Sequence, residues 1–128
     1  MIYLDSSVAL ARLLDETRSP PDDFWSNDFV SSRLLEYEVL NRILSRTDWS
    51  VHVGRARLLL DRVDLVEMTP SILARALAPF PLPVRTLDGL HLATMDFLRR
   101  QGQMLELATY DQRLAAVAQP LGFPLASV

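Results

Sequence analysis

Short apolar segments alternate with longer segments of helical periodicity along this chain of 128 residues. Strands separated by helices pair in parallel, because the helical crossover returns the chain to the same end of the sheet. The pattern therefore predicts an α/β fold, a three-layer α/β/α sandwich around a central, mainly parallel sheet, in one domain of residues 1–128. The predicted strands are 1–5, 29–31, 64–69, 105–110 and 123–126. The predicted helices are 7–16, 33–46, 51–63, 70–78, 86–101 (with Gly102 as its stop) and 111–119, and residues 18–23 are predicted to form a turn.

The composition excludes several functional classes. The chain has no cysteine, so disulfides, thiolate metal sites and cysteine nucleophiles are absent. It has two histidines, His52 and His91, and a zinc site would have to be built mainly from carboxylates. No apolar run is long enough to span a bilayer, and the N-terminus lacks a secretion signal, so we expect a cytoplasmic protein with no membrane partner.

Two aspartates directly follow predicted strands. Asp5 ends the segment MIYLD, and Asp111 ends LELATYD. In open parallel sheets, ligands bind in the crevice at the carboxyl ends of the strands. If the two strands are neighbours, both carboxylates share that crevice. Each aspartate could instead serve only as the N-cap of the helix that follows it, and the local sequence leaves both roles open.

Two further candidate acids lie on predicted helices. Asp88 is in the first turn of helix 86–101, where the helix dipole favours a negative charge, and the apolar character of that helix places it beside a crevice. On helix 33–46, the periodicity puts Glu38 on the polar side and Glu36 on the apolar side, and does not select either as a ligand. His91, one turn after Asp88, is expected to be half-buried and hydrogen-bonded, or to support a ligand.

All 13 basic residues are arginine, and the formal net charge is −3. A basic surface for nucleic acid is therefore modest. Asp96 precedes Arg99 and Arg100 by three and four residues, the spacing of a surface ion pair. The arginines near the acidic segments are candidates for phosphate contacts, or for ordinary solvated side chains: Arg33, Arg42, Arg46, Arg85 and Arg113.

A group of three or four carboxylates without histidine or cysteine has a specific chemical meaning. Like charges brought together repel, and they stay ionised when a hard divalent cation lies among them. Oxygen ligands favour Mg²⁺ or Mn²⁺ over zinc and copper. Such a cation lowers the pKa of a bound water and can aim it at phosphorus. The acids therefore point to hydrolysis of a phosphodiester without a protein nucleophile.

Four sequence blocks occur in an order that resembles the PIN-domain ribonucleases, most closely the VapC-type toxins of toxin–antitoxin pairs. The blocks are IYLDSS (2–7), SRLLEYEV (32–39), LDGLHLAT (87–94) and TYDQRL (109–114). The second block matches the family pattern Ser-x-Leu-x-x-x-Glu, which selects Glu38 over Glu36. The third departs from the family at Gly89, where alanine is usual.

The resemblance implies an endoribonuclease that uses Mg²⁺ or Mn²⁺ to activate water. Ser6 and Thr109 would support the site through hydrogen bonds. A cognate VapB-type antitoxin would inhibit the protein, and a homodimer is expected. The implied catalytic residues and metal ligands are Asp5, Glu38, Asp88 and Asp111.

Two other functions stay open at this point. An acid-pocket phosphatase would use Asp5 as its nucleophile, but that class needs a second aspartate where this chain has Ser7, and often a lysine, which this chain lacks. A non-catalytic PIN-like module would bind RNA or protein without cutting it, and it would not need to take up Mg²⁺.

Overall fold

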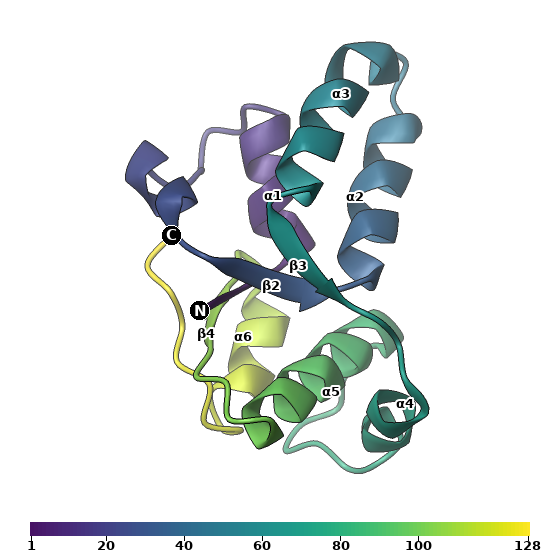
Figure 1. Cartoon of the computed structure of the whole chain (residues 1–128), viewed down its shortest axis with the longest axis vertical. Coiled ribbons are helices and arrows are strands. Elements are labelled where there is room, and N and C mark those ends of the chain that lie inside the picture. The colour runs from purple at the N-terminus through teal and green to yellow at the C-terminus, as the bar shows by residue number, and fades with distance from the viewer.

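The computed structural model describes all residues, 1–128, and its centre is a four-stranded, fully parallel sheet with the order β3-β2-β1-β4 (Figure 1). β1 pairs with β2 on one side and with β4 on the other. The two strands that lead to Asp5 and Asp111 are therefore neighbours. The strands are β1 (Ile2–Leu4), β2 (Phe29–Ser32), β3 (Val63–Val66) and β4 (Glu106–Ala108).

Helices cover both faces of the sheet (Figure 1). One layer contains α1 (Ser6–Leu13), α2 (Leu34–Leu44) and α3 (Trp49–Leu60). The other layer contains α4 (Pro70–Ala76), α5 (Thr86–Arg100) and α6 (Gln112–Ala118). The predicted three-layer α/β/α sandwich is confirmed. No helix is both long enough and apolar enough to cross a membrane.

The side chains of β1 alternate between the two helical layers, as the pleat of a strand requires. Ile2 and Leu4 pack in the core shared with α1, α2 and α3. Tyr3 packs on the opposite face, in a second core that includes Leu92 and Met95 of α5. All three β1 side chains are buried, which is typical of a central strand in a parallel sheet. Tyr3 therefore carries its hydroxyl group into the layer of α5.

Two segments differ in their type of secondary structure from the sequence prediction. The strand predicted at 123–126 is reduced to a single bridge between Leu107 and Leu125. Leu107 donates to the carbonyl of Pro124 and accepts from Ala126, but Pro124 has no N–H with which to extend the ladder. Within the predicted turn, a 3₁₀ helix begins and runs over Asp22–Ser26 (η1), burying two aromatic residues, Phe24 and Trp25.

Several helices are shorter than predicted or shifted by two or three residues. α1 ends at Leu13 rather than at residue 16, and Asp15 just beyond it has φ +50°, a conformation that ends a helix. α3 begins at Trp49 and ends at Leu60, since β3 already begins at Val63. The predicted stop after α5 is correct: Gly102 has φ +91°.

Asp96 forms the ion pairs with Arg99 and Arg100 that its spacing predicted, but its carboxylate is buried and not at the surface. Its side chain is buried, and it binds three guanidinium groups, at 3.0 Å from Arg75, 2.7 Å from Arg99 and 3.1 Å from Arg100. Burial alone would raise the pKa of Asp96, but the hydrogen bonds and charges of these arginines hold that pKa below its usual value. Asp96 therefore ties α4 to the last turns of α5.

Replacing Asp96 with asparagine (Asp96→Asn) should lower the free energy of unfolding at pH 7 by about 2 kcal/mol, less than for a fully buried pair because Arg99 and Arg100 keep contact with water. A carboxyl group with a lowered pKa stabilises the fold above its unfolded pKa, and loses that effect as pH falls through its folded pKa. Urea unfolding should therefore show a gap between wild type and variant that closes on acidification. Asp64→Asn, at an exposed site without an ion pair, is the control. A gap of constant size at all pH values would contradict this assignment.

Candidate active site

The four predicted acids line one pocket of about 450 Å³ at the carboxyl edge of the sheet. Leu4 of β1 lies opposite Ala108 of β4, so the chain leaves both strands at the same edge and places Asp5 near Asp111. Each aspartate is also the N-cap of the next helix, α1 or α6. α2 contributes Glu38 one turn after its start, and α5 contributes Asp88 from its first turn.

Asp5 is held through one of its two carboxylate oxygens. Oδ2 accepts hydrogen bonds from the Ser7 hydroxyl at 2.6 Å and the Thr109 hydroxyl at 2.7 Å, and a longer one from the Ser7 amide at 3.4 Å. Oδ1 accepts no hydrogen bond from the protein. Thr109 and Ser6 were both expected to donate hydrogen bonds to the acids, and both do, Thr109 to Asp5 and Ser6 to Glu38. The contact from Ser7 was not expected.

The two carboxylate oxygens of Asp111 have different partners. Oδ1 accepts the amides of Arg113 at 2.9 Å and Leu114 at 3.4 Å, which caps α6. Oδ2 forms an ion pair with Arg85 Nη2 at 3.0 Å. Asp111 therefore caps α6 and also lines the pocket.

Arg85 lies between two of the acids. Its Nε is 3.4 Å from Asp88 Oδ2, while its Nη2 reaches Asp111. Partial burial and the nearby charge of Asp111 raise the pKa of Asp88, although Arg85 opposes the shift. A cationic group beside these carboxylates offsets repulsion between them. Arg85 was expected as a phosphate contact or as a solvated side chain, and here it is a counter-ion of the acids.

Glu38 and Glu36 occupy different surroundings on α2. Glu38 faces the pocket, where Oε1 lies 2.5 Å from His91 Nε2 and Oε2 accepts from Ser6 at 3.3 Å. Glu36 does not line the pocket. It lies on the side of α2 that also carries the buried Val39 and Ile43, as the periodicity predicted. Because it is in the first turn, 43% of its side chain is exposed, and it pairs with Arg33 at 3.4 Å.

His91 is more deeply buried than the half-buried position expected, with 1% of its surface exposed. Its Nδ1 is 2.7 Å from the Tyr3 hydroxyl, on the side of the ring opposite Glu38. Burial alone would lower the pKa of the imidazole, but the hydrogen bond and charge of Glu38, with the charges of Asp5 and Asp88, raise it above the usual value.

The donor atoms of the pocket suit a hard cation. Its four acids and its hydroxyl groups offer oxygen, the ligand that Mg²⁺ and Mn²⁺ prefer. No three of the acidic or histidine side chains are close enough to form a ready-made three-ligand site. Magnesium keeps several waters and commonly takes one or two carboxylates directly, so this spacing fits its chemistry.

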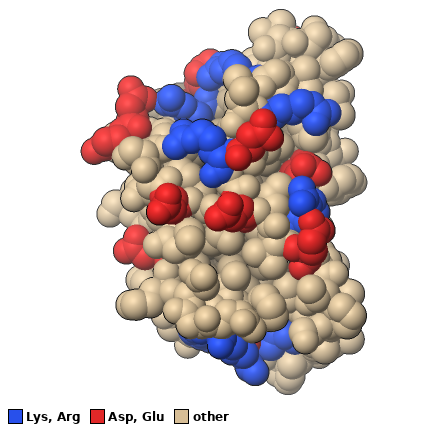
Figure 2. Space-filling model, in the orientation of Figure 1, with Lys and Arg blue, Asp and Glu red and all other residues tan.

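Away from this pocket, arginine and acidic side chains are interspersed. Figure 2 shows both charges together across the upper half of one face, without a continuous basic surface. Of the five arginines proposed for phosphate contacts, Arg33 and Arg46 pair with Glu67 and Asp48. Arg42 and Arg85 line the pocket of the acids.

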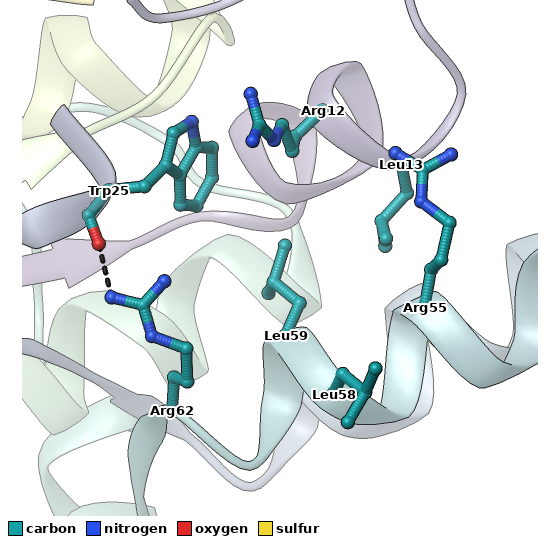
Figure 3. Close-up of a pocket in the computed structure, with 7 residues that line it drawn as sticks. All are labelled: Arg12, Leu13, Trp25, Arg55, Leu58, Leu59 and Arg62. Carbon is teal, nitrogen blue, oxygen red and sulfur yellow. Dashed lines mark hydrogen bonds between the residues drawn. The ribbon is translucent and has the colours of Figure 1, made fainter. Parts of the chain in front are cut away.

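A second pocket, of about 250 Å³, has a different character (Figure 3). Three arginines and three leucines line it beside Trp25, and no acid does. Arg62 points toward Trp25 and donates to its carbonyl, and Arg12 pairs with Asp22 at 2.7 Å. Without carboxylates, this pocket offers no ligands for a cation.

Comparison with protein families matches residues 2–120 to the PIN domain. The chain belongs to the PIN-domain family. Within it, this PIN domain is 30% identical to Ribonuclease VapC47 of Mycobacterium tuberculosis (strain CDC 1551 / Oshkosh), over 99% of this chain and 96% of that protein. It is 35% identical to Ribonuclease VapC46 of M. tuberculosis (strain ATCC 25618 / H37Rv), over 94% and 92%. These relatives place it in the VapC group, as the sequence blocks predicted.

The fold of this PIN domain is also that of a solved VapC complex. The crystal structure of VapBC2 from Rickettsia felis bound to a DNA fragment from their promoter contains a chain that superposes with a TM-score of 0.72. The match covers 98% of each chain at 13% sequence identity, so it supports the fold and nothing finer.

Sequence reasoning missed two side chains that touch the acids or their partners. Ser7 was considered as the residue that stands where a phosphatase would have a second aspartate, and not as a partner of Asp5, although its place two residues after Asp5 allows a local hydrogen bond. Tyr3 was predicted only as part of the strand at residues 1–5. Its alternation with Ile2 and Leu4 indicates which face it occupies, but no local pattern identifies His91 as its partner.

Proposed function

We propose that this VapC-group protein is a metal-dependent endoribonuclease, the toxin of a toxin–antitoxin pair, acting in the cytoplasm as a single PIN domain of residues 1–128. The observation that carries the proposal is the meeting of four acids, from four separate segments, in one pocket at the carboxyl edge of the sheet. The names of the relatives, ribonucleases of the VapC type, support the same activity.

In this proposal, Asp5, Glu38, Asp88 and Asp111 hold Mg²⁺, or Mn²⁺, directly or through water. When bound, the cation supplies an acidified water and positive charge for the phosphoryl oxygens. Ser7 and Thr109 hold Oδ2 of Asp5, which leaves Oδ1 available in the pocket.

Arg85 and Arg42 lie at the same pocket and are placed to meet an RNA phosphate. Arg85 can exchange its present carboxylate partners for that phosphate once a cation offsets the acids. RNA would then be bound mainly at the pocket, because the rest of the surface has mixed charge.

The partners proposed are RNA as substrate, a VapB-type antitoxin and a second copy of the chain. Support for the antitoxin comes from the VapBC complex that shares this fold. The phosphatase alternative loses support from Ser7: it stands where that class has a second aspartate, and its hydroxyl is bound to Asp5.

Purified protein should cleave RNA in Mg²⁺ or Mn²⁺ and stop when EDTA is added. Because water and not the 2′-hydroxyl of RNA is the nucleophile, the new ends should carry no 2′,3′-cyclic phosphate. Incubation with total RNA, followed by analysis of end chemistry, measures both. Cyclic ends, or cleavage that continues in EDTA, would contradict the mechanism. Failure to cut any RNA or to bind Mn²⁺ by calorimetry would favour the non-catalytic module.

A further inference from the structure

A buried chain of hydrogen bonds runs from the sheet to Glu38. The Ser32 amide donates to the Tyr3 hydroxyl at 3.2 Å. The same hydroxyl is 2.7 Å from His91 Nδ1, and His91 Nε2 is 2.5 Å from Glu38 Oε1. The members come from β2, β1, α5 and α2, so these hydrogen bonds connect the sheet to both helical layers and end at the pocket.

This series of hydrogen bonds is shielded from water except at its final carboxylate, that of Glu38. Ser32 and Tyr3 are 0% exposed and His91 is 1% exposed, whereas 18% of the Glu38 side chain is accessible. Burial raises the pKa of Tyr3 well above its usual value, so its hydroxyl keeps its proton. The groups that precede Glu38 therefore cannot exchange their hydrogen-bond partners for solvent.

The geometry leaves His91 little freedom. Its ring packs edge-on against Tyr3, with an interplanar angle of 83°. A ring flip would replace both nitrogens by carbons and break both hydrogen bonds at once. Since a carboxylate only accepts, Nε2 must carry the proton shared with Glu38. One oxygen of Glu38 is thus fixed from the protein interior, while the other stays beside Ser6.

We propose that His91 is a positioning residue: anchored by Tyr3, it fixes the Glu38 carboxylate in the orientation used in the acid pocket. Its effect on cleavage rests on the proposed function. The hydrogen bonds themselves do not, and they can be measured in protein that holds no metal. The simpler alternative is a core histidine whose bonds serve stability alone.

NMR on metal-free protein tests the chain directly. A buried, hydrogen-bonded Nε2–H exchanges slowly with water and should give a resolved proton signal downfield of the amides. His52, the other histidine, pairs with the half-exposed Asp48 and provides the internal comparison. Glu38→Gln should move the His91 signal upfield, because a neutral acceptor binds more weakly. A His91 ring without a proton on Nε2 would overturn the proposal.

Tyr3→Phe tests the positioning role, because it removes the anchor and keeps the ring. It should weaken Mn²⁺ binding and lower kcat by about 10-fold, the scale on which a group behind a ligand acts, with KM for RNA little changed. Leu98→Ala is the matched control: it lies in the same core cluster as Tyr3, at the far end of α5. It should lower Tm without changing either quantity.

The outcomes separate this inference from the proposed function. If Tyr3→Phe lowers Tm as Leu98→Ala does, but leaves Mn²⁺ affinity unchanged, His91 has a structural role and the positioning proposal is wrong. If the NMR and Mn²⁺ results hold while no RNA is cut, the positioning of Glu38 stands and the ribonuclease activity fails. His91→Gln, which keeps an N–H donor, should retain more Mn²⁺ affinity than His91→Ala, and equal losses would contradict the proposal.

Discussion

Asp5→Asn should reduce RNA cleavage by at least about 100-fold, the scale on which loss of one preorganised electrostatic contact acts. Asparagine keeps the size of the side chain, and its carbonyl can still accept from Ser7 and Thr109. The variant removes the negative charge, which a divalent cation requires, from the centre of the pocket. Cleavage rates of purified wild type and variant at saturating Mg²⁺ measure the effect.

The same substitution separates metal binding from folding. Without metal, Asp5 contributes to repulsion among clustered acids, so the variant should melt in EDTA at the same temperature as wild type or above it. Mg²⁺ should raise Tm for wild type and not for the variant, because a ligand stabilises the state that binds it. Asp28→Asn, at an exposed aspartate before β2 and at the opposite edge of the sheet, should behave as wild type. Wild-type cleavage by Asp5→Asn would refute the proposed mechanism.

The alternation of strands and helices was sufficient to predict the layers and the edge at which the site lies. Asp5 and Asp111 could be placed at strand ends because that placement depends on neighbouring residues. Their proximity depends on β1 lying beside β4, which no local pattern states. The resemblance to the PIN-domain ribonucleases supplied that link, since it implies one site that contains both aspartates.

Long-range polar contacts could not be predicted. Tyr3 and His91 are 88 positions apart in the chain, and helical or strand periodicity specifies a face but not the partner across it. Asp96 shows the same limit. Its spacing to Arg99 and Arg100 was correct, but the third partner, Arg75 of α4, converts an expected surface pair into a buried one.

Gly89, where alanine is usual in the family, lies close to the side chains of the loop before α5. A Cβ at this position would lie 3.3 Å from Val84 Cγ2 and 3.8 Å from Phe80. The proline-rich loop before α5 therefore packs tightly against the start of that helix. Since Asp88 is the adjacent residue, this close packing helps to fix the backbone from which its carboxylate enters the pocket.

Glu38→Gln should lower kcat by about 10- to 100-fold, because the pocket loses one charge while the amide oxygen can still accept from His91. Glu36→Gln is a matched control, with the same chemical change two residues earlier on the same helix. Glu36 pairs with Arg33 in contact with water, so its replacement should change neither cleavage nor Tm measurably. Cleavage kinetics and melting curves of the two variants, measured side by side, show which of the two glutamates acts in the pocket.

The contrast between these two glutamates is a sharp test of how α2 presents its acids. Viewed along the helix axis, the two side chains are separated by 200° of rotation at 100° per residue. A single orientation of α2 therefore cannot point both of them into the pocket. The contacts of Glu38 with His91 and Ser6 fix that setting. Loss of cleavage in Glu36→Gln with wild-type kinetics in Glu38→Gln would mean that α2 is rotated from the position described. In that case the buried chain through Tyr3 would end on a side chain that takes no part in catalysis.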